Sequence, residues 1–356
     1  MRTLTKQHLK QICLCLCLVI FITGCNRFPT LENPLKNITT TAQWETLCKE
    51  KKELLQKELY GIFPTEDRNV SVTGTTTPLP QWNAMMEEST ITFGKNLTAT
   101  LRITYPNDSQ KHPVIFRLDY LSDYEYRAPV EEQMVKEQRY AFVTIGRNTT
   151  APDEAQNREV FGLTQYKEQD LGAIALWAYA AVAAADYVST LSFADTEKFA
   201  ITGHSRDGKA AICAAVMDER FRVVAPNGSG VGGAASFRVS EEDSEPTTHL
   251  AEAFPHWFSS TFNNKAMNNT LTVDMLDAFC LLAPRGVLRT EAKNDVWANP
   301  NGVLAIQSAM NPVYEFLGTP TSYNQVVFRE GEHGHTPEDW ETLIRFCDHV
   351  FYGTDF

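Results

Sequence analysis

The stretch ITGHSRDGKAA, residues 201–211, decides the fold of this chain. An apolar run of β type ends at Gly203, and an alanine-rich helical stretch follows at once, so the pattern predicts a strand, a sharp turn and a helix. Ser205 lies at the apex of that turn. The N-terminus of the following helix offers unpaired N–H groups and positive potential where an oxyanion would form. The pattern therefore predicts that Ser205 is a nucleophile.

The turn departs from the usual nucleophile elbow, which reads G-x-S-x-G. Asp207 stands where the second glycine is expected, and Gly208 follows one position later. The generic motif is broken at this point, and the variant needs its own explanation.

Strand-like and helix-like segments alternate from about residue 113 onward. This order predicts a mostly parallel sheet covered by helices on both faces, that is, an α/β-hydrolase fold built as a three-layer sandwich. Before it, we expect an antiparallel opening section with strands at 70–75, 86–93 and 99–105. Further strands are expected at 113–120, 140–145, 198–202, 221–226, 286–290 and 325–328. Helices are expected at 44–60, 170–191, 273–282, 302–317 and 338–352, and residues 236–272 are expected to form a long irregular insert.

Residues 1–25 are predicted to be a lipoprotein signal peptide. Three basic residues precede an apolar run over 12–22 that is too short to cross a bilayer as a stable helix. The sequence then reads ITGC, which resembles a bacterial lipobox, and cleavage there leaves Cys25 as the lipidated first residue. The alternative is an ordinary signal peptide that happens to contain a cysteine.

The lipobox predicts an exported bacterial lipoprotein in the periplasm or outer membrane, attached to the membrane through its lipid anchor alone. The polar stretch 26–43 is predicted to be a tether. No shift in composition divides residues 44–356, so we expect one catalytic domain and a monomer.

Composition excludes several classes of function. The formal net charge of −12 argues against nucleic acid as a partner. The cysteines after the signal segment have no CxxC spacing, so a zinc site is not expected. His333 and His335 form a His-x-His pair without a third ligand nearby, and the sequence suggests no metal and no cofactor. Cys213, Cys280 and Cys347 lie in apolar, helix-like settings and are expected to be buried thiols.

The remaining catalytic residues are sought at strand ends after Ser205, because this fold takes its triad in the order serine, acid, histidine. Asp295 follows the strand predicted at 286–290, and His333 follows the last strand. In a triad, Ser205 attacks an ester carbonyl, His333 takes its proton and returns it to the leaving alcohol, and Asp295 holds the imidazole in the right tautomer. Glu291 lies nearer the strand end and is the main alternative acid.

Other residues around this set have two interpretations each. His335 is the second histidine after the last strand, and His333 is favoured over it as the base. The alternative is that His335 lies on the surface or caps the closing helix. His204 precedes the nucleophile and is expected to be structural. Arg206 is predicted to face the oxyanion, where one donor is worth roughly 3 kcal/mol, or else to be a surface arginine. Lys209 lies one helical turn after Ser205, where it donates to a sugar hydroxyl or is simply solvated.

Two tryptophans in loops near strand ends are candidate platforms for a sugar ring. They are Trp257, in the stretch FPHWF at 254–258, and Trp297, in the stretch DVWANPNG at 295–302. The alternative for both is core packing, and it is favoured more for Trp257 than for Trp297.

The elbow GHSRDGKAA, residues 203–211, resembles the G-[CH]-S-R-x-G-K-[GA]-A elbow of the glucuronoyl esterases, carbohydrate esterase family 15. That pattern explains the displaced glycine. The likeness continues in PNGSGVGG at 226–233, FPHWF at 254–258, LAPR at 282–285, DVWANPNG at 295–302 and GEHG at 331–334. It covers roughly residues 110–352, and the bacterial members look most similar.

The resemblance implies hydrolysis of esters between 4-O-methyl-glucuronic acid on xylan and lignin alcohols, so the partner is a polysaccharide or lignin–carbohydrate ester. It implies that Ser205 is the nucleophile, His333 the base and Arg206 the oxyanion arginine. It also implies that Lys209 contacts uronate hydroxyls and that Trp297 lines the sugar pocket.

The chain departs from the family pattern at several positions. Gly228 stands where many members carry a catalytic glutamate, whereas Asp295 matches an aspartate of some bacterial members, so the acid is assigned to Asp295. The usual D-x-H before the A-P-R segment lacks its histidine at 274–276. The insert has no obvious match to the glutamine and glutamate that bind uronate. Two other functions therefore stay open: an acetyl xylan esterase or other glycan acyl esterase of the same fold, and an inactive glycan-binding lipoprotein.

Overall fold

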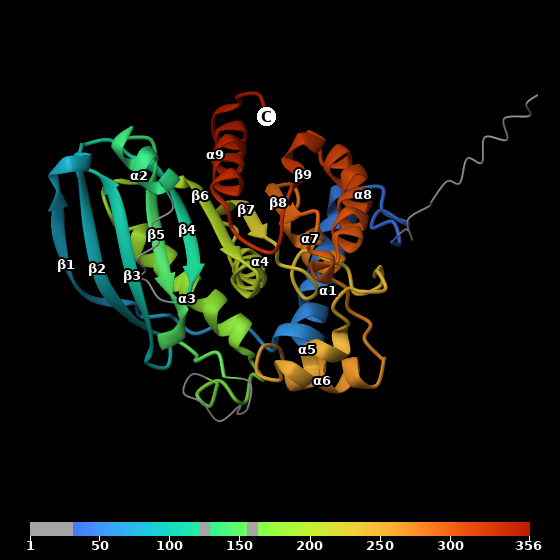
Figure 1. Ribbon diagram of the computed structural model, residues 1–356. Coiled ribbons are helices and arrows are strands. Elements are labelled where there is room, and N and C mark those ends of the chain that lie inside the picture. Colours follow the sequence, from blue (N-terminus) through green and yellow to red (C-terminus); the bar gives the residue numbers. More distant parts are fainter. Residues whose placement is uncertain (1–30, 121–128, 155–162) are drawn as a thin grey trace, which may run out of the picture.

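The computed structural model describes residues 31–120, 129–154 and 163–356, and the predicted signal peptide with Cys25 lies outside these ranges. Their centre is a nine-stranded sheet in the order β1-β2-β3-β5-β4-β6-β7-β8-β9, flanked by helices (Figure 1). The strands are β1 (Ser71–Leu79), β2 (Ala84–Phe93), β3 (Leu97–Pro106), β4 (His112–Asp119), β5 (Ala141–Gly146), β6 (Ala194–His204), β7 (Phe221–Asn227), β8 (Gly286–Ala292) and β9 (Asn324–Arg329).

The helices complete the three layers of the molecule. They are α1 (Thr41–Leu55), α2 (Pro129–Lys136), α3 (Ala173–Val188), α4 (Arg206–Met217), α5 (Thr247–Ala253), α6 (Ser260–Met267), α7 (Met275–Leu282), α8 (Pro300–Phe316) and α9 (Pro337–Tyr352). Short helical turns are η1 (Gln56–Tyr60), η2 (Pro80–Trp82), η3 (Arg147–Thr149), η4 (Val296–Ala298) and η5 (Thr321–Tyr323).

Pairing within the sheet divides it into two parts. β1, β2, β3 and β5 pair antiparallel in succession, whereas β5, β4, β6, β7, β8 and β9 pair parallel. The prediction of an antiparallel opening section followed by a mostly parallel sheet is confirmed. Crossover helices cover both faces of the parallel part, so every residue of β5 is buried.

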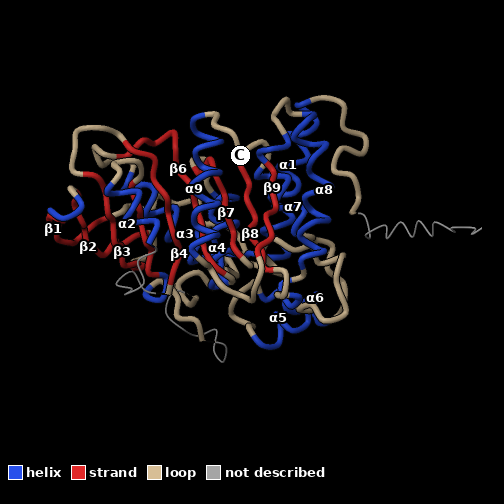
Figure 2. Tube along the Cα trace, turned by 45° about the horizontal axis from the view of Figure 1, so that its top comes forward, coloured by secondary structure: helices blue, strands red, loops and turns tan. Residues whose placement is uncertain are grey.

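Side chains alternate between two hydrophobic clusters, one on each face of the sheet. On β4, Val114 and Phe116 pack with helices α1, α3, α4, α7 and α8, whereas Ile115 packs with α2 and α9. The tube view shows these helices on either side of the strands (Figure 2). Helix α3 is buried at fourteen of its positions, in line with its nearly all-apolar sequence.

Several boundaries differ from the sequence-based expectations. The insert at 236–272 is not irregular throughout, because it contains α5 and α6. Helix α2 was not expected at all, since its eight residues are short and polar for a helix signal. The first helix begins earlier than expected, because Thr40 caps it through the N–H of Gln43, and its last turn, η1, is a π-helix that ends at Tyr60 as expected. Residues 31–40 are not a free tether, since Leu31, Leu35 and Ile38 pack against the core.

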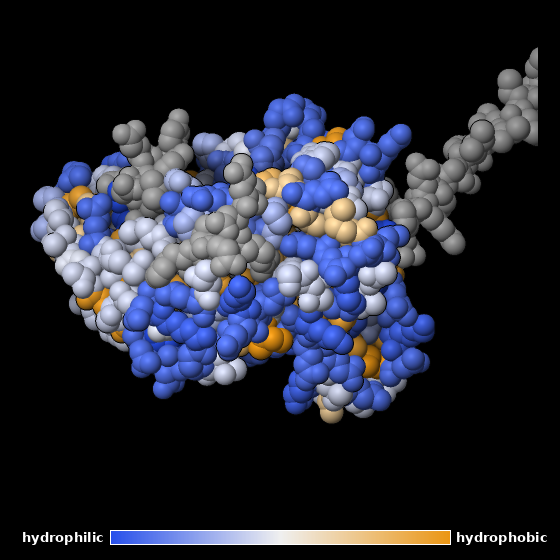
Figure 3. Space-filling view, turned by 90° about the horizontal axis from the view of Figure 1, so that it is seen from below, coloured by the Kyte–Doolittle hydropathy of each residue, from blue (hydrophilic) through white to orange (hydrophobic). Residues whose placement is uncertain are grey.

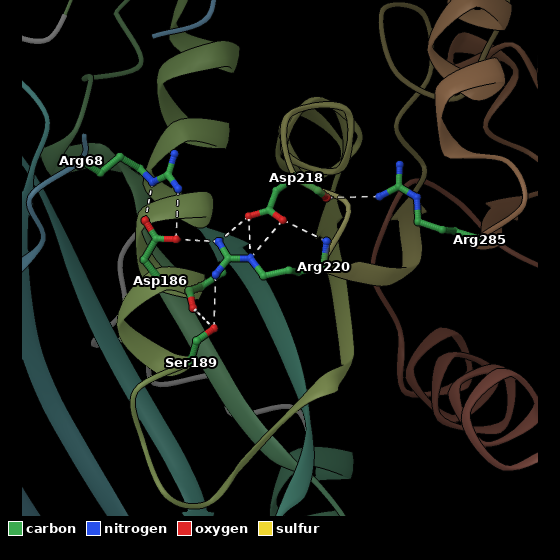
Figure 4. A network of polar contacts seen from close by, with 7 residues as sticks. Arg68, Asp186, Ser189, Asp218, Arg220 and Arg285 are labelled. Atoms are coloured by element: carbon green, nitrogen blue, oxygen red, sulfur yellow. Dashed lines mark hydrogen bonds and ion pairs between the residues drawn. The ribbon is translucent and has the colours of Figure 1, made fainter. Parts of the chain in front are cut away.

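A polar network ties together the amino ends of the parallel strands (Figure 4). Asp186, near the end of α3, accepts hydrogen bonds from Arg68 at 3.1 Å and from Arg220 at 2.6 Å. Arg220 also pairs with Asp218, whose carbonyl accepts from Arg285 at 3.2 Å. These residues precede β7 and β8, whereas the elbow lies at the opposite, carboxyl end of the sheet. The network therefore holds elements together and takes no part in the site.

Figure 3 views the molecule from the side on which α5 and α6 lie in Figure 1, and most of that face is hydrophilic. None of the helices described is long and apolar enough to cross a membrane. Cys48, Cys213, Cys280 and Cys347 are free thiols, and all but Cys48 are buried as expected.

Candidate active site

Ser205 is placed by a strained turn between β6 and α4. Its φ and ψ angles are 56° and −122°, a region that residues with a side chain rarely occupy and that marks a nucleophile elbow. Two glycines make room for it. A Cβ at Gly203 would lie 2.4 Å from the backbone of Asp207, and one at Gly208 would lie 2.8 Å from the Cβ of Ser229. The displaced glycine thus serves close packing of α4 against the loop after β7.

His333 and Asp295 meet at the carboxyl end of the sheet. The Nδ1 of His333 lies 2.5 Å from Oδ2 of Asp295, although the two residues come from loops after β9 and β8. Asp295 is 8% exposed, and its loop is closed by its N–H donating to the carbonyl of Ala292. A carboxylate at Nδ1 places the ring proton there and leaves Nε2 to accept a proton from a nucleophile.

Glu291, the alternative acid, has a different environment. It is 1% exposed, and neither of its carboxyl oxygens has a hydrogen-bond partner in the described structure. Burial, followed by the charge of Asp295, raises its pKa to about 8, so at pH 7 it is mainly a neutral acid. It makes no contact with His333, which the structure pairs with Asp295 instead.

His204 and His335 pack around the ring of His333. The His204 ring centroid lies 4.4 Å from that of His333, and its Nδ1 lies 2.6 Å from Oδ1 of Asn227. Burial lowers the pKa of His204, which keeps a second positive charge away from His333. His335 neither lies free on the surface nor caps α9: its ring stacks on Trp340 at 4.6 Å, and Thr336 is the N-cap.

Gly228, in the loop after β7, lies next to His333 but has no side chain to contact it. Gly228 has a φ of +49°, and a Cβ built on it would lie 3.5 Å from Nδ1 of His333. A side chain at this position would therefore touch the same imidazole nitrogen that Asp295 already binds. The structure explains geometrically how an acid at this position can take that role.

Arg206 begins helix α4 and lines the cavity beside Ser205. Its Nη1 donates to Oδ2 of Asp153 at 2.7 Å, and its guanidinium lies 4.9 Å from the ring of Trp257. Asp153 also accepts from Nε2 of His256 and from Nε1 of Trp257, each at 2.8 Å. These donors hold the pKa of Asp153 well below its usual range. Arg206 is thus a partly exposed arginine that a buried carboxylate anchors at the rim of the cavity.

These residues surround one cavity of about 380 Å³. It brings together the predicted catalytic and sugar-binding groups, which come from loops far apart in the sequence. Its lining residues include Ser205, Arg206, Lys209, Gly228, Glu245, His249, Trp257, Asp295, Trp297 and His333.

Lys209 lines the cavity, but it is not the solvated lysine of the alternative interpretation. It is 3% exposed, and its Nζ donates to the carbonyl of Ser229 at 2.7 Å and to that of Val231. Burial lowers its pKa to about 8. Two carbonyls occupy two of the three ammonium protons, which leaves one for a hydroxyl of a bound molecule.

The two tryptophans differ in exposure. Trp257 is 3% exposed and stacks on Phe254 with ring centroids 3.8 Å apart, so core packing is its main role. Trp297 is 49% exposed, and the edge of His249 meets it at 5.2 Å. Trp297 is therefore the side chain with a free face for a sugar ring.

Sequence reasoning missed three residues of the site: Asp153, Glu245 and His249. Glu245 is 8% exposed, lines the cavity, and lies 2.9 Å from Nδ1 of His249. Glu245 and His249 lie in the insert, whose sequence has no periodic signal. A Glu-x-x-x-His spacing on one helical face was the available hint for that pair.

No group of three or more potential metal ligands occurs within the ranges that the structure describes. The residues of the cavity are instead those of acyl transfer: a strained serine, a histidine bound to a carboxylate, and an anchored arginine next to a helix N-terminus.

Comparison with solved structures identifies the fold. A glucuronoyl esterase from Solibacter usitatus superposes with a TM-score of 0.80 at 24% identity, covering 91% of this chain and 99% of that one. A promiscuous CE15 esterase from a marine bacterial metagenome gives a TM-score of 0.79 at 26% identity, covering 90% and 97%. These likenesses confirm the α/β-hydrolase fold.

Sequence comparison gives the same family. A carbohydrate esterase from an unknown prokaryotic organism is 37% identical over 51% of this chain and 45% of its own length. A 4-O-methyl-glucuronoyl methylesterase of Phanerochaete carnosa is 31% identical over 47% and 43%. The chain thus spans less than half the length of these two relatives. The model of the family "Glucuronyl esterase, fungi" matches residues 89–318, which is more than half of the chain. The chain therefore belongs to the glucuronoyl esterase family, carbohydrate esterase family 15.

Proposed function

We propose that this protein is a serine esterase that hydrolyses 4-O-methyl-glucuronoyl esters, the linkage between glucuronoxylan and lignin alcohols. The observation that carries this proposal is the 2.5 Å contact between His333 and Asp295 in the cavity that holds Ser205. Family membership and the names of relatives such as the methylesterase of Phanerochaete carnosa support the choice of ester.

The reaction follows from the positions of these groups. Ser205 Oγ attacks the ester carbonyl while His333 takes its proton, and Asp295 stabilises the imidazolium. The oxyanion forms beside Arg206 and the first N–H groups of α4, which have no partner within the helix. His333 returns the proton to the leaving alcohol. Water then hydrolyses the acyl-enzyme by the same steps.

The sugar end of the substrate is placed by other residues that line the cavity. Lys209 donates to a hydroxyl, Glu245 accepts from one, and Trp297 provides an apolar face for the ring. An esterified uronic acid carries no charge, so it is not repelled by the acidic chain as a free uronate is.

Side-by-side assays test this function against its alternatives. We expect the wild type to hydrolyse benzyl glucuronate, and Ser205→Ala to lose that turnover by several orders of magnitude. Turnover of acetylated xylan alone would establish the acetyl esterase instead. Retained glycan binding without turnover of either compound would indicate an inactive binding protein.

We also propose that the mature protein is a bacterial lipoprotein anchored through Cys25, on the strength of the ITGC sequence at 22–25. Expression of the full chain in a bacterial host should place it in the membrane fraction. Cys25→Ala should abolish lipid attachment and cleavage before residue 25, which labelled palmitate and the precursor mass report, and a variant that is still lipidated would contradict the proposal.

A further inference from the structure

We propose that Arg147 is a positioning residue for the oxyanion site, where its one buried guanidinium holds both the anchor of the Arg206 side chain and the first turn of α4. This inference rests on the proposed esterase function. Arg147 follows β5 in the turn η3, at the same carboxyl edge of the sheet as Ser205. Its side chain is 3% exposed and does not line the cavity, so it acts on a substrate through other residues.

Arg147 has a fixed place before any substrate binds. Its guanidinium carbon lies 4.0 Å from the centre of the buried Trp177 ring, which is a cation–π contact. The Nε1 of Trp177 donates to the carbonyl of Ala151 at 2.8 Å, which ties α3 to the loop after η3. That loop also carries Asp153, the anchor of the oxyanion arginine. The Trp177 side chain therefore holds the guanidinium and the loop that carries this carboxylate.

The first contact of Arg147 reaches helix α4. Its Nε donates to Oδ1 of Asp207, the residue after Arg206. Burial raises the pKa of the Asp207 carboxyl, and the charge of Arg147 is what opposes this rise most. Arg206 and Asp207 are the first two residues of α4, so helix geometry leaves their N–H groups without a partner inside the helix. Arg147 thus holds the turn whose N–H groups serve the oxyanion.

The second contact of Arg147 reaches the carboxylate that anchors Arg206. Nη2 of Arg147 lies 3.5 Å from Oδ2 of Asp153, and Nη1 of Arg206 donates to that same oxygen at 2.7 Å. The negative charge of Asp153 is therefore divided between two arginines. Arg206 keeps positive potential for the oxyanion that a carboxylate paired with it alone would cancel.

The four charges of this cluster balance. Arg147 and Arg206 carry the two positive charges. Asp153 and Asp207 carry the two negative charges, and Arg147 contacts both of them. Loss of Arg147 leaves two carboxylates against one arginine, next to the place where the oxyanion forms. The excess negative charge opposes the transition state but not the neutral ester, so it lowers kcat more than it changes KM.

The test measures kcat and KM on benzyl glucuronate, with rates expressed per folded protein from circular dichroism. Arg147→Met keeps the length of the side chain without its charge. It should lower kcat by about 10- to 100-fold and change KM by less than about threefold. Arg147→Lys keeps the charge but lacks the planar fork that spans two carboxylates, so it should lose less kcat than Arg147→Met.

A double variant serves where a lone buried carboxylate unfolds the protein. Arg147→Met with Asp207→Asn removes one charge of each sign and leaves no unpaired charge in the cluster. Asp153 then pairs with Arg206 alone, and α4 has lost its anchor. We therefore expect the double variant to fold and still to lose about tenfold in kcat.

A matched control removes the cation from another buried carboxylate. Lys265 pairs with Glu58 at 2.6 Å, and neither residue lines the cavity. Lys265→Met should leave kcat per folded protein unchanged, and an equal loss in this control would overturn the inference. Normal kcat in the double variant, or a change confined to KM, would overturn it as well. Failure of the wild type on every glucuronoyl ester would instead refute the proposed function.

Discussion

The ends of β7 and β8 lie side by side at the site, yet β7 contributes backbone to it and β8 contributes carboxyl groups. β7 ends at Asn227. Gly228 follows it and places backbone, but no side chain, next to His333. The end of β8 carries Glu291, and Asp295 follows the strand, so this strand end brings two carboxyl groups. Of these two, the carboxylate of Asp295 is the one that contacts the imidazole. The carboxylate that pairs with His333 is therefore set by which loop reaches Nδ1, and not by the number of carboxyls nearby.

Glu291 shows why charge matters as much as position. It is closer to the strand end than Asp295, but complete burial without a hydrogen-bond partner keeps it neutral at pH 7. Asp295 lines the cavity, where its Oδ2 lies 2.5 Å from Nδ1 of His333.

The largest effect is expected from Asp295→Asn. Loss of the carboxylate leaves His333 in the wrong tautomer, so kcat on benzyl glucuronate should fall by about 10⁴-fold. Glu291 should not compensate, because burial raises its pKa to about 8 and Asp295 is the carboxylate that contacts Nδ1. Near-normal kcat in this variant would show that another carboxyl activates His333.

Gly228→Glu in the Asp295→Asn background transfers the acid from one strand end to the other. A side chain at 228 starts 3.5 Å from Nδ1 of His333, so kcat should recover by about tenfold or more despite the strain of a positive φ. Gly228→Gln in the same background is the control, since it has similar size without charge. Equal recovery in both variants would mean that the carboxylate is not the cause.

Asp153→Asn tests the anchor of the oxyanion arginine. It weakens a charge-assisted hydrogen bond to Arg206, and such bonds contribute about 1.5–3 kcal/mol, so kcat should fall by about 10- to 100-fold with a smaller change in KM. His256→Phe removes another donor to the same carboxylate without touching Arg206, and should cost much less. A change confined to KM would assign Asp153 to substrate binding.

The smallest effect on activity is expected from Glu291→Gln, which acts on stability. The folded-state pKa of Glu291 is raised to about 8. Between the pKa near 4.5 in the unfolded chain and the pKa of about 8 in the folded state, only the folded state keeps the proton. The free energy of unfolding therefore falls as the pH rises, by up to about 1.4 kcal/mol per pH unit. In urea unfolding at pH 5 and pH 8, the variant should lose less stability than the wild type over this interval. An identical loss in both proteins would show that Glu291 ionises normally.

The parts of the fold and of the candidate site that could be predicted from the sequence are those that depend on local patterns or on strand order. The strand, turn and helix at 201–211 were predicted correctly, because the signals of the glycines, the serine and the alanines depend on neighbours only a few positions away. Ser205, Asp295 and His333 line one cavity, as their order along the chain predicts, because parallel strands bring successive carboxyl ends to one edge. The insert was harder, since α5 and α6 are short and stabilised by packing more than by their own periodicity.

The sequence by itself determined the hydrolase fold, the serine elbow and the two candidates for the acid, because each depends on local spacing or on strand order. The resemblance to the family already assigned the acid to Asp295, but only the tertiary structure shows the contact of Asp295, rather than Glu291, with His333, since burial and hydrogen bonding are set by loops that meet in space. The same holds for Asp153, which lies 53 positions before Arg206 and yet anchors it. Long-range contacts of this kind leave no mark in the spacing of residues along one chain.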